Sequence, residues 1–114
     1  MNTLNNKNAK DPFDKLIFED NLRAKQLVID KGLDMILVVF NNGKLLKLKI
    51  SDYPKLSNAK EKELLNWSFI SGGIGVRWDD LDEDLSIKGF IKTAALNNAI
   101  RNLQTNDNDE RIVA

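Results

Sequence analysis

The chain has 114 residues, of which 42% are hydrophobic and 30% charged, and its 17 Lys and Arg balance its 17 Asp and Glu to a formal net charge of zero. This balance gives no reason to expect strong nonspecific binding to nucleic acid or to an anionic membrane. The sequence contains no Cys and no His, which excludes disulfides, thiol nucleophiles, Ser-His-Asp triads and ordinary zinc or copper sites.

Residues 1–12 are polar and rich in Asn, and we expect them to form a disordered extension. They hold no apolar segment typical of a signal peptide, and no apolar run of the sequence approaches the length of a membrane helix. We therefore expect a cytoplasmic protein with no membrane contact. A single α+β domain is expected over 13–103, followed by a flexible tail over 104–114. The pattern does not decide whether KLIF, beginning at Lys15, is a strand or a helix.

Three β-like runs fall between Ala24 and Ile50, and they predict an antiparallel three-stranded meander. Asn42-Gly43 joins the second run to the third, and Asn-Gly is typical of a two-residue hairpin turn. With that turn, Val39 faces Leu46 and the neighbouring pairs complete one fully apolar face of the sheet.

The other face of this meander carries Ile36, Val38 and Phe40, although a half-solvated sheet should be polar there. Two interpretations stay open. The terminal segments cover this face, or it is an exposed surface used for pairing with another chain. On the second interpretation these three residues are candidate partner-binding residues.

The remaining elements are mostly helical. Asn58, with Glu61 three residues later, predicts a capped helix that runs through Trp67. A short fourth strand is expected over 75–78. The last third predicts one long amphipathic helix with a single wide apolar stripe, from Ile87 to Leu103, and with Asn97 and Arg101 on its opposite face. The fold class is thus α+β, with a three- to four-stranded antiparallel meander packed by a short helix and a C-terminal amphipathic helix.

The stretch SGGIGVRWDDLDEDL, from Ser71 to Leu85, holds three glycines and then five carboxylates. Its glycine spacing fits neither a dinucleotide fingerprint nor a Walker motif, and it predicts a tight turn. The acids lack the glycine and the final glutamate of a calcium loop. They either cap the last helix or bind calcium or magnesium weakly. If the loop binds a partner, the candidate residues are Arg77, Asp79, Asp80, Asp82 and Glu83.

The chain resembles a family of small bacterial proteins catalogued as domain of unknown function 2442. The resemblance covers 53–91 and consists of an aromatic-Pro-x-Leu stretch, an Asn-Trp pair, an Ile-x-Gly-Gly-x-Gly turn, a tryptophan and the run LDEDLS. Many members carry His and Pro around that tryptophan, where this chain has Arg77 and Asp79. The resemblance implies a small α+β domain, an antitoxin-like role and a structural signature made of Gly72, Gly73, Gly75, Trp78, Leu81, Leu85 and Ser86.

These features predict a non-enzymatic, antitoxin-like protein-binding module with no catalytic residue, cofactor or metal. The expected partner is a toxin-like protein or a nuclease, direct nucleic-acid binding is not expected, and a homodimer is left open. The alternative is an inhibitor encoded by a phage or mobile element and aimed at a nucleic-acid-handling enzyme, with the acidic loop imitating a phosphate backbone.

Overall fold

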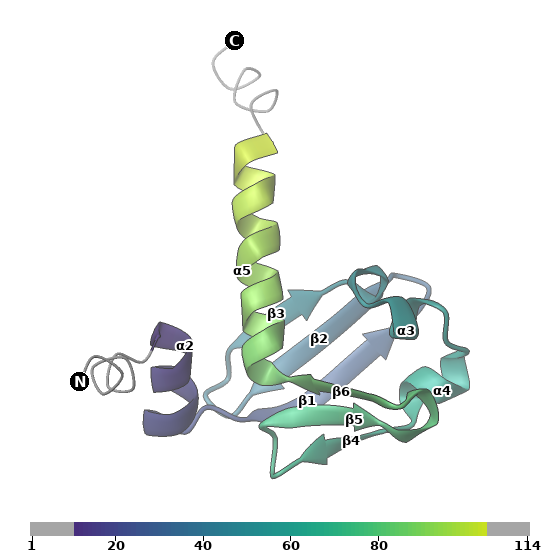
Figure 1. The fold of residues 1–114 in the computed structure, drawn as a ribbon, viewed down its shortest axis with the longest axis horizontal. Coiled ribbons are helices and arrows are strands. Elements are labelled where there is room, and N and C mark those ends of the chain that lie inside the picture. Colours follow the sequence, from purple (N-terminus) through teal and green to yellow (C-terminus); the bar gives the residue numbers. More distant parts are fainter. Residues whose placement is uncertain (1–10, 105–114) are drawn as a thin grey trace, which may run out of the picture.

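The computed structural model describes residues 11–104 and shows two three-stranded antiparallel sheets with short helices and one long helix (Figure 1). The first sheet, in the order β1-β2-β3, contains Ala24–Asp30, Met35–Phe40 and Leu45–Leu48. The second sheet, in the order β4-β5-β6, contains Trp67–Ile70, Gly75–Trp78 and Glu83–Ser86. The helical elements are α2 (Pro12–Asp14) with the π-helical turn η1 (Lys15–Glu19), η2 (Ile50–Asp52), α3 (Pro54–Ser57), α4 (Glu61–Leu65), η3 (Asp79–Leu81) and α5 (Ile87–Gln104).

The α+β class and the meander of the first sheet are confirmed. The predicted fourth strand exists as β5, but it belongs to the second sheet. That sheet contains two strands that the sequence did not indicate, β4 and β6. The two sheets and the start of α5 share one hydrophobic core, to which Val38, Trp78 and Phe90 each contribute a buried side chain.

The turn between β2 and β3 has three residues, 41–43, and not the predicted two. Phe40 donates its N–H to the Lys44 carbonyl at 2.9 Å, and Gly43 donates to the Phe40 carbonyl at 2.9 Å. Gly43 has a positive φ of 84°, whereas Asn42 does not. A type I turn followed by one left-handed residue has this form, and it adds one residue to the loop.

The extra loop residue shifts the hairpin register by one position, so the predicted pairing is wrong. Val38 faces Leu46 and Ile36 faces Leu48. A shift of one residue moves every side chain of a strand to the opposite face of the sheet. For that reason Ile36, Val38 and Phe40 lie in the core, with 0%, 0% and 6% exposure. The interpretation of these three residues as an exposed partner-binding face is wrong.

The helix predicted from Asn58 through Trp67 is much shorter. α4 begins at Glu61, and the Glu63 carboxylate accepts a 2.8 Å hydrogen bond from the N–H of Lys60, the N-cap residue. After Leu65 the chain forms β4, where Trp67 and Phe69 stack edge to face with ring centroids 4.9 Å apart. Aromatic residues at alternate positions favour a strand, and here they override the helical spacing of the leucines before them.

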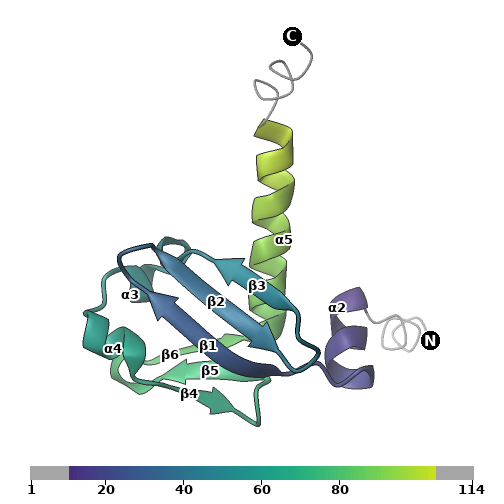
Figure 2. The same ribbon diagram turned by 180° about the vertical axis from the view of Figure 1, so that it is seen from behind.

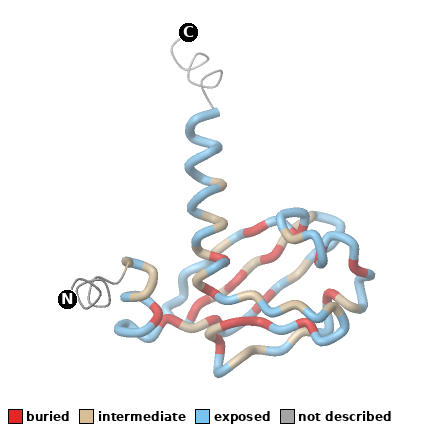
Figure 3. Tube along the Cα trace, in the orientation of Figure 1, coloured by how far each residue is buried: buried red, intermediate tan, exposed pale blue. Residues whose placement is uncertain are grey.

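The long helix α5 packs on the body mainly through its first half, and its second half projects away (Figure 1). Ile87 and Phe90 are fully buried, while every residue from Asn98 to Gln104 is exposed (Figure 3). At about 100° per residue, Leu103 falls about 180° from Ala94 around the helix. The single apolar stripe predicted for this helix is therefore two stripes on opposite sides, and the prediction is wrong in that respect.

The N-terminal helical turn is tied to α5 by a lysine. Lys88 Nζ lies 2.8 Å from Asp14 Oδ1 and 3.2 Å from Asp11 Oδ2. Asp11 also caps α2 by accepting the Asp14 N–H at 2.8 Å. The disordered extension predicted over 1–12 thus ends too late, because Asp11 and Pro12 belong to the helical turn. The rest of that prediction, and the tail after Gln104, lie outside the described residues.

Candidate functional site

The glycine-rich stretch forms a tight turn, as predicted from its spacing. It joins β4 to β5, and Gly72 and Gly73 have φ values of 73° and 112°. The Gly73 carbonyl accepts the Ala24 N–H at 2.9 Å, which links the second sheet to the start of β1. A Cβ at Gly73 would overlap the backbone of Ala24, so only glycine fits this junction.

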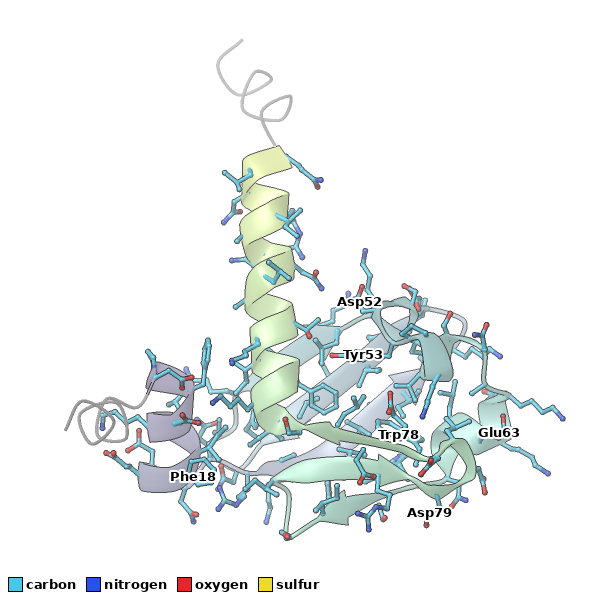
Figure 4. The ribbon with its side chains drawn as sticks, viewed as in Figure 1. Phe18, Asp52, Tyr53, Glu63, Trp78 and Asp79 are labelled. Carbon is cyan, nitrogen blue, oxygen red and sulfur yellow. The ribbon has the colours of Figure 1, made fainter. Side chains whose placement is uncertain are left out.

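Trp78 is fully buried, as expected, and it lies on the same side of β5 as Val76 while Arg77 is exposed. Figure 4 shows the indole pointing into the interior and Asp79, the next residue, at the periphery. Leu81, within the acidic run, and Leu85, just after it, pack against the core. These placements put the tryptophan and both leucines in or against the hydrophobic core.

The acids of this loop do not cap α5, which corrects one of the two interpretations above. Glu83 and Asp84 belong to β6, and the helix begins after it. Ser86 takes the cap position instead, since its Oγ accepts the Gly89 N–H at 3.0 Å. A serine oxygen at this position satisfies one of the free N–H groups of the first turn.

Three of the loop's charged groups are already engaged. Arg77 and Asp84 face each other across β5 and β6 and form two hydrogen bonds of 3.0 and 3.1 Å. Hydrogen bonding from the guanidinium holds the pKa of Asp84 below its ordinary value, and the carboxylate raises the pKa of Arg77. Asp80 accepts a 2.9 Å hydrogen bond from the Asn66 amide.

The other candidate acids of the loop are on the surface. Asp79 and Asp82 are exposed and Glu83 is half-buried. Lys55 binds this segment through the Asp82 backbone carbonyl, at 2.9 Å, and leaves the carboxylate free. Among residues 11–104 no three acids converge in a way that could hold a metal ion. Nor is any helix in this range long and apolar enough to cross a membrane.

The surface of the first sheet that faces away from the core is mixed, with several apolar side chains beside Gln26, Asp30 and Lys47, and we call it the outer face. Seen from behind in Figure 2, no described element covers β1, β2 and β3. The register places side chains from all three strands on this face: Val28, Met35, Leu37, Val39 and Leu45. Val28 is 41% and Leu45 60% exposed.

The projecting half of α5 adds a second apolar surface, which we call the distal stripe: Leu96, Ala99, Ile100 and Leu103. Leu96 is 59% and Leu103 77% exposed. Isolated exposed leucines are common on protein surfaces, but these four apolar residues form a row on one side of the helix.

Between α5 and β3 lies a groove of about 740 Å³, which we call the α5–β3 groove. Its walls include Lys47 and Lys49 from the strand side and Ala94, Asn97 and Arg101 from the helix. Asn97 donates its amide to Asp52 Oδ2 at 2.8 Å across the base of the helix, and Figure 4 shows Asp52 beside α5. Asn97 and Arg101 were expected on the side of the helix away from the body and lie on the side toward it.

A smaller hollow of about 440 Å³ separates η1 from β6, with Ile17, Ile74 and Leu85 in its walls. Its charged groups are already paired, because Lys88 is bound to Asp11 and Asp14 and Asp84 is bound to Arg77. This hollow therefore lacks a free polar group that would orient a ligand.

The fold and these surfaces define a small α+β domain with exposed apolar side chains on the outer face of one sheet and on one projecting helix, and others, such as Phe18 and Leu33, outside these two surfaces. A family model described as protein of unknown function (DUF2442) matches residues 24–95, more than half of the chain, and the protein belongs to this family. The earlier resemblance over 53–91 is thus confirmed and extends back to β1.

Two solved structures share the fold. A crystal structure of a protein of unknown function from Rhodospirillum rubrum is similar with a TM-score of 0.57 and 25% identity, covering 63% of this chain and 87% of that one. The solution structure of the uncharacterized protein CV0863 from Chromobacterium violaceum is similar with a TM-score of 0.58 and 20% identity, covering 70% and 72%. A comparison with curated proteins gave no match.

Sequence reasoning missed the outer face and the α5–β3 groove. The outer face was missed because the hairpin register was displaced by one residue. The groove was missed because α5 was expected to lie along the sheet. The sequence did contain a signal for the groove. Asn97, Asn98 and Arg101 continue the side of the helix on which Ala94 is buried, and such a polar row does not pack on a core.

Proposed function

We propose that this protein is a non-enzymatic, antitoxin-like binding module that acts through protein–protein contact in the cytoplasm. The observation that carries the proposal is the projecting half of α5. It exposes Leu96, Ile100 and Leu103 and stands clear of the body (Figures 1 and 3).

Helices owe most of their stability in proteins to tertiary packing, and fewer than about 15 isolated residues are marginal in water. In the distal half of α5, Asn97 is held by Asp52 on the side toward the body, yet the opposite side carries a regular exposed apolar row. A partner that covers this row would supply the missing contacts, as when an amphipathic helix lies in a groove. The uncovered outer face of the first sheet offers further apolar area.

The experiment is co-expression of the tagged chain with the products of its neighbouring genes, followed by identification of what copurifies in stoichiometric amount. The double variant Leu96→Glu and Leu103→Glu should lose the partner while keeping the wild-type circular dichroism spectrum. The matched control, Asp79→Asn with Asp82→Asn, should retain it. Equal capture by all three chains would contradict the assignment to α5, and a robust turnover by the purified chain would contradict a non-enzymatic role.

The acidic loop supports the second candidate, an inhibitor of a nucleic-acid-handling enzyme carried by a phage or mobile element. The Asp79 and Asp82 carboxylates accept no hydrogen bond from residues 11–104, so they are free to bind cations of a partner. The same control variant tests this candidate, since neutralising these two acids should then abolish inhibition of the enzyme. Inhibition that survives would leave the α5 surface as the better explanation.

A further inference from the structure

We infer that the free edge of β3 receives an extended acidic segment of a partner protein, which lies as a fourth strand of the first sheet within the α5–β3 groove. This inference rests on the proposed protein-binding function and specifies the chemistry of the partner segment.

The backbone of β3 is available for pairing. β3 is an outer strand of the first sheet, with β2 on one side only. Because Phe40 and Lys44 form a hydrogen-bonded pair, the alternation of an antiparallel ladder turns the N–H and C=O groups of Leu45 and Lys47 away from β2. In the described part of the chain, no other backbone group pairs with these four. They form a template for an added strand.

The space beside this edge is a groove and not open solvent. An added strand lies about 4.8 Å from its neighbour, and the α5–β3 groove opens on that side of β3 with α5 as its opposite wall. Its volume of about 740 Å³ is within the range of peptide and ligand sites. A strand bound there would contact β3 through its backbone and Ala94 and Ile100 of α5 through its side chains.

The charges of the groove select an acidic strand. Lys47, Lys49 and Arg101 line it, and none of them forms an ion pair or side-chain hydrogen bond within residues 11–104. The acid in its wall, Asp52, is already bound by Asn97 at 2.8 Å. Lys47 in β3 and Lys49, in extended backbone just after it, are two residues apart and lie on one face, where every second residue of an added strand would meet them.

The same charges disfavour a second copy of this chain in the groove. α5 contains Lys88, Lys92 and Arg101 and no acid. Two β3 edges placed side by side would bring their lysines together, and lysine on an edge strand is a common device against self-pairing. A strand with alternating carboxylates avoids this repulsion, and its negative charges are attracted to the lysines and the arginine of the groove.

The test uses a capped nine-residue peptide of alternating Glu and Val, titrated into the full chain and followed by amide NMR. The matched probes are a peptide of alternating Lys and Val and a Glu-Val peptide with Pro at every third position. We expect saturable binding of the first probe alone, slowed hydrogen exchange at the Leu45 and Lys47 amides, and binding that weakens as salt is added.

Two variants separate the backbone and charge contributions. Leu45→Pro removes an outward N–H at the start of β3, where Pro is tolerated, and leaves every cation in place. It should abolish binding, whereas its control Leu45→Val should not. Lys47→Gln with Arg101→Gln should weaken binding about tenfold, as the loss of two exposed ion pairs implies. Lys25→Gln on β1 is the control for a general charge effect.

Absence of binding at millimolar Glu-Val peptide would overturn the inference, as would equal binding by the Lys-Val peptide or by Leu45→Pro. Concentration-dependent self-association through the β3 edge would also overturn it in favour of a second copy. The proposed function stands, and only the strand-addition site falls, if the wild-type chain still captures a protein partner in these cases. The double variant Leu96→Glu and Leu103→Glu should then lose that partner.

Discussion

Trp78 donates its indole N–H to the backbone carbonyl of Leu64 at 2.9 Å, with both residues fully buried. The bond ties the second sheet to the last turn of α4, whose final carbonyls have no partner within the helix. The signature tryptophan thus fills core volume and also satisfies a helix end. This double role requires an aromatic ring with a donor at its edge.

Trp78→Ala should largely unfold the protein. Removal of a buried tryptophan costs about 3–5 kcal/mol, against a total of about 5–15 kcal/mol for a domain. Asp79→Asn, one residue further at the exposed end of the strand, should change the free energy of unfolding by less than about 1 kcal/mol. Urea denaturation of both variants is the measurement. A Trp78→Ala protein with an unchanged transition would show that the ring is not part of the core.

Trp78→Phe distinguishes the two roles of the ring. Phenylalanine retains most of the apolar volume but leaves the Leu64 carbonyl without a donor. A buried acceptor left unsatisfied costs about 1–3 kcal/mol, so we expect an intermediate loss of stability and faster hydrogen exchange in α4. A loss as large as that of Trp78→Ala would assign the effect to packing alone.

Gly73→Ala should destabilise the junction between the two sheets. Its φ of 112° is a conformation that residues with a side chain rarely adopt, and the new Cβ would overlap the backbone of Ala24. We expect the strained backbone alone to lower the free energy of unfolding by about 1–3 kcal/mol. Gly72→Asn is the matched control, because φ is 73° there, asparagine tolerates the left-handed region, and a Cβ meets nothing within 4 Å. Thermal melts that rank the two variants in the opposite order would contradict this explanation.

The Arg77–Asp84 pair should make the β5–β6 pairing sensitive to acid. Hydrogen bonding from Arg77 lowers the pKa of Asp84 in the folded state. A lowered folded pKa contributes stability that is present above the unfolded value of about 3.9 and is lost as the pH falls through the folded pKa. Side-chain NMR titration should give a carboxyl pKa below the ordinary value in the wild type and a return toward it in Arg77→Gln. Equal titration curves for the two proteins would show that the pair does not form in solution.

The first sheet shows how far the sequence leads and where it fails. The existence of β1, β2 and β3 follows from runs of β-branched and leucine residues between turns. Which face of each strand is buried does not follow from the sequence, because Asn41-Asn42-Gly43 supports both a two-residue and a three-residue turn. A single residue of the loop decides which side of β2 is buried. Since β2 is apolar on both sides, its own pattern contains no information that would correct the error.

The candidate site was predictable in part for a different reason. Trp78 and Gly73 have local roles, in phase along a strand and in a turn, and spacing along the chain is enough to assign them. The start of α5 is also local, but the cap was assigned to the acids and is made by Ser86. The α5–β3 groove depends instead on the angle at which α5 leaves the body. That angle is set by contacts between residues far apart in the sequence, such as Asn97 with Asp52, and no local pattern contains it.

The two halves of α5 should respond to mutation in opposite ways. Phe90 is fully buried and packs edge to face on Tyr53 with ring centroids 6.0 Å apart, so Phe90→Ala should cost about 3–5 kcal/mol. Leu103 is 77% exposed on the projecting half, so Leu103→Gln should change the free energy of unfolding by less than about 0.5 kcal/mol. If α5 instead lay along the sheet with a single stripe, as its sequence pattern indicated, both substitutions would destabilise the protein strongly. Chemical denaturation of the two variants measures this difference, and it decides whether the distal stripe is free to meet a partner.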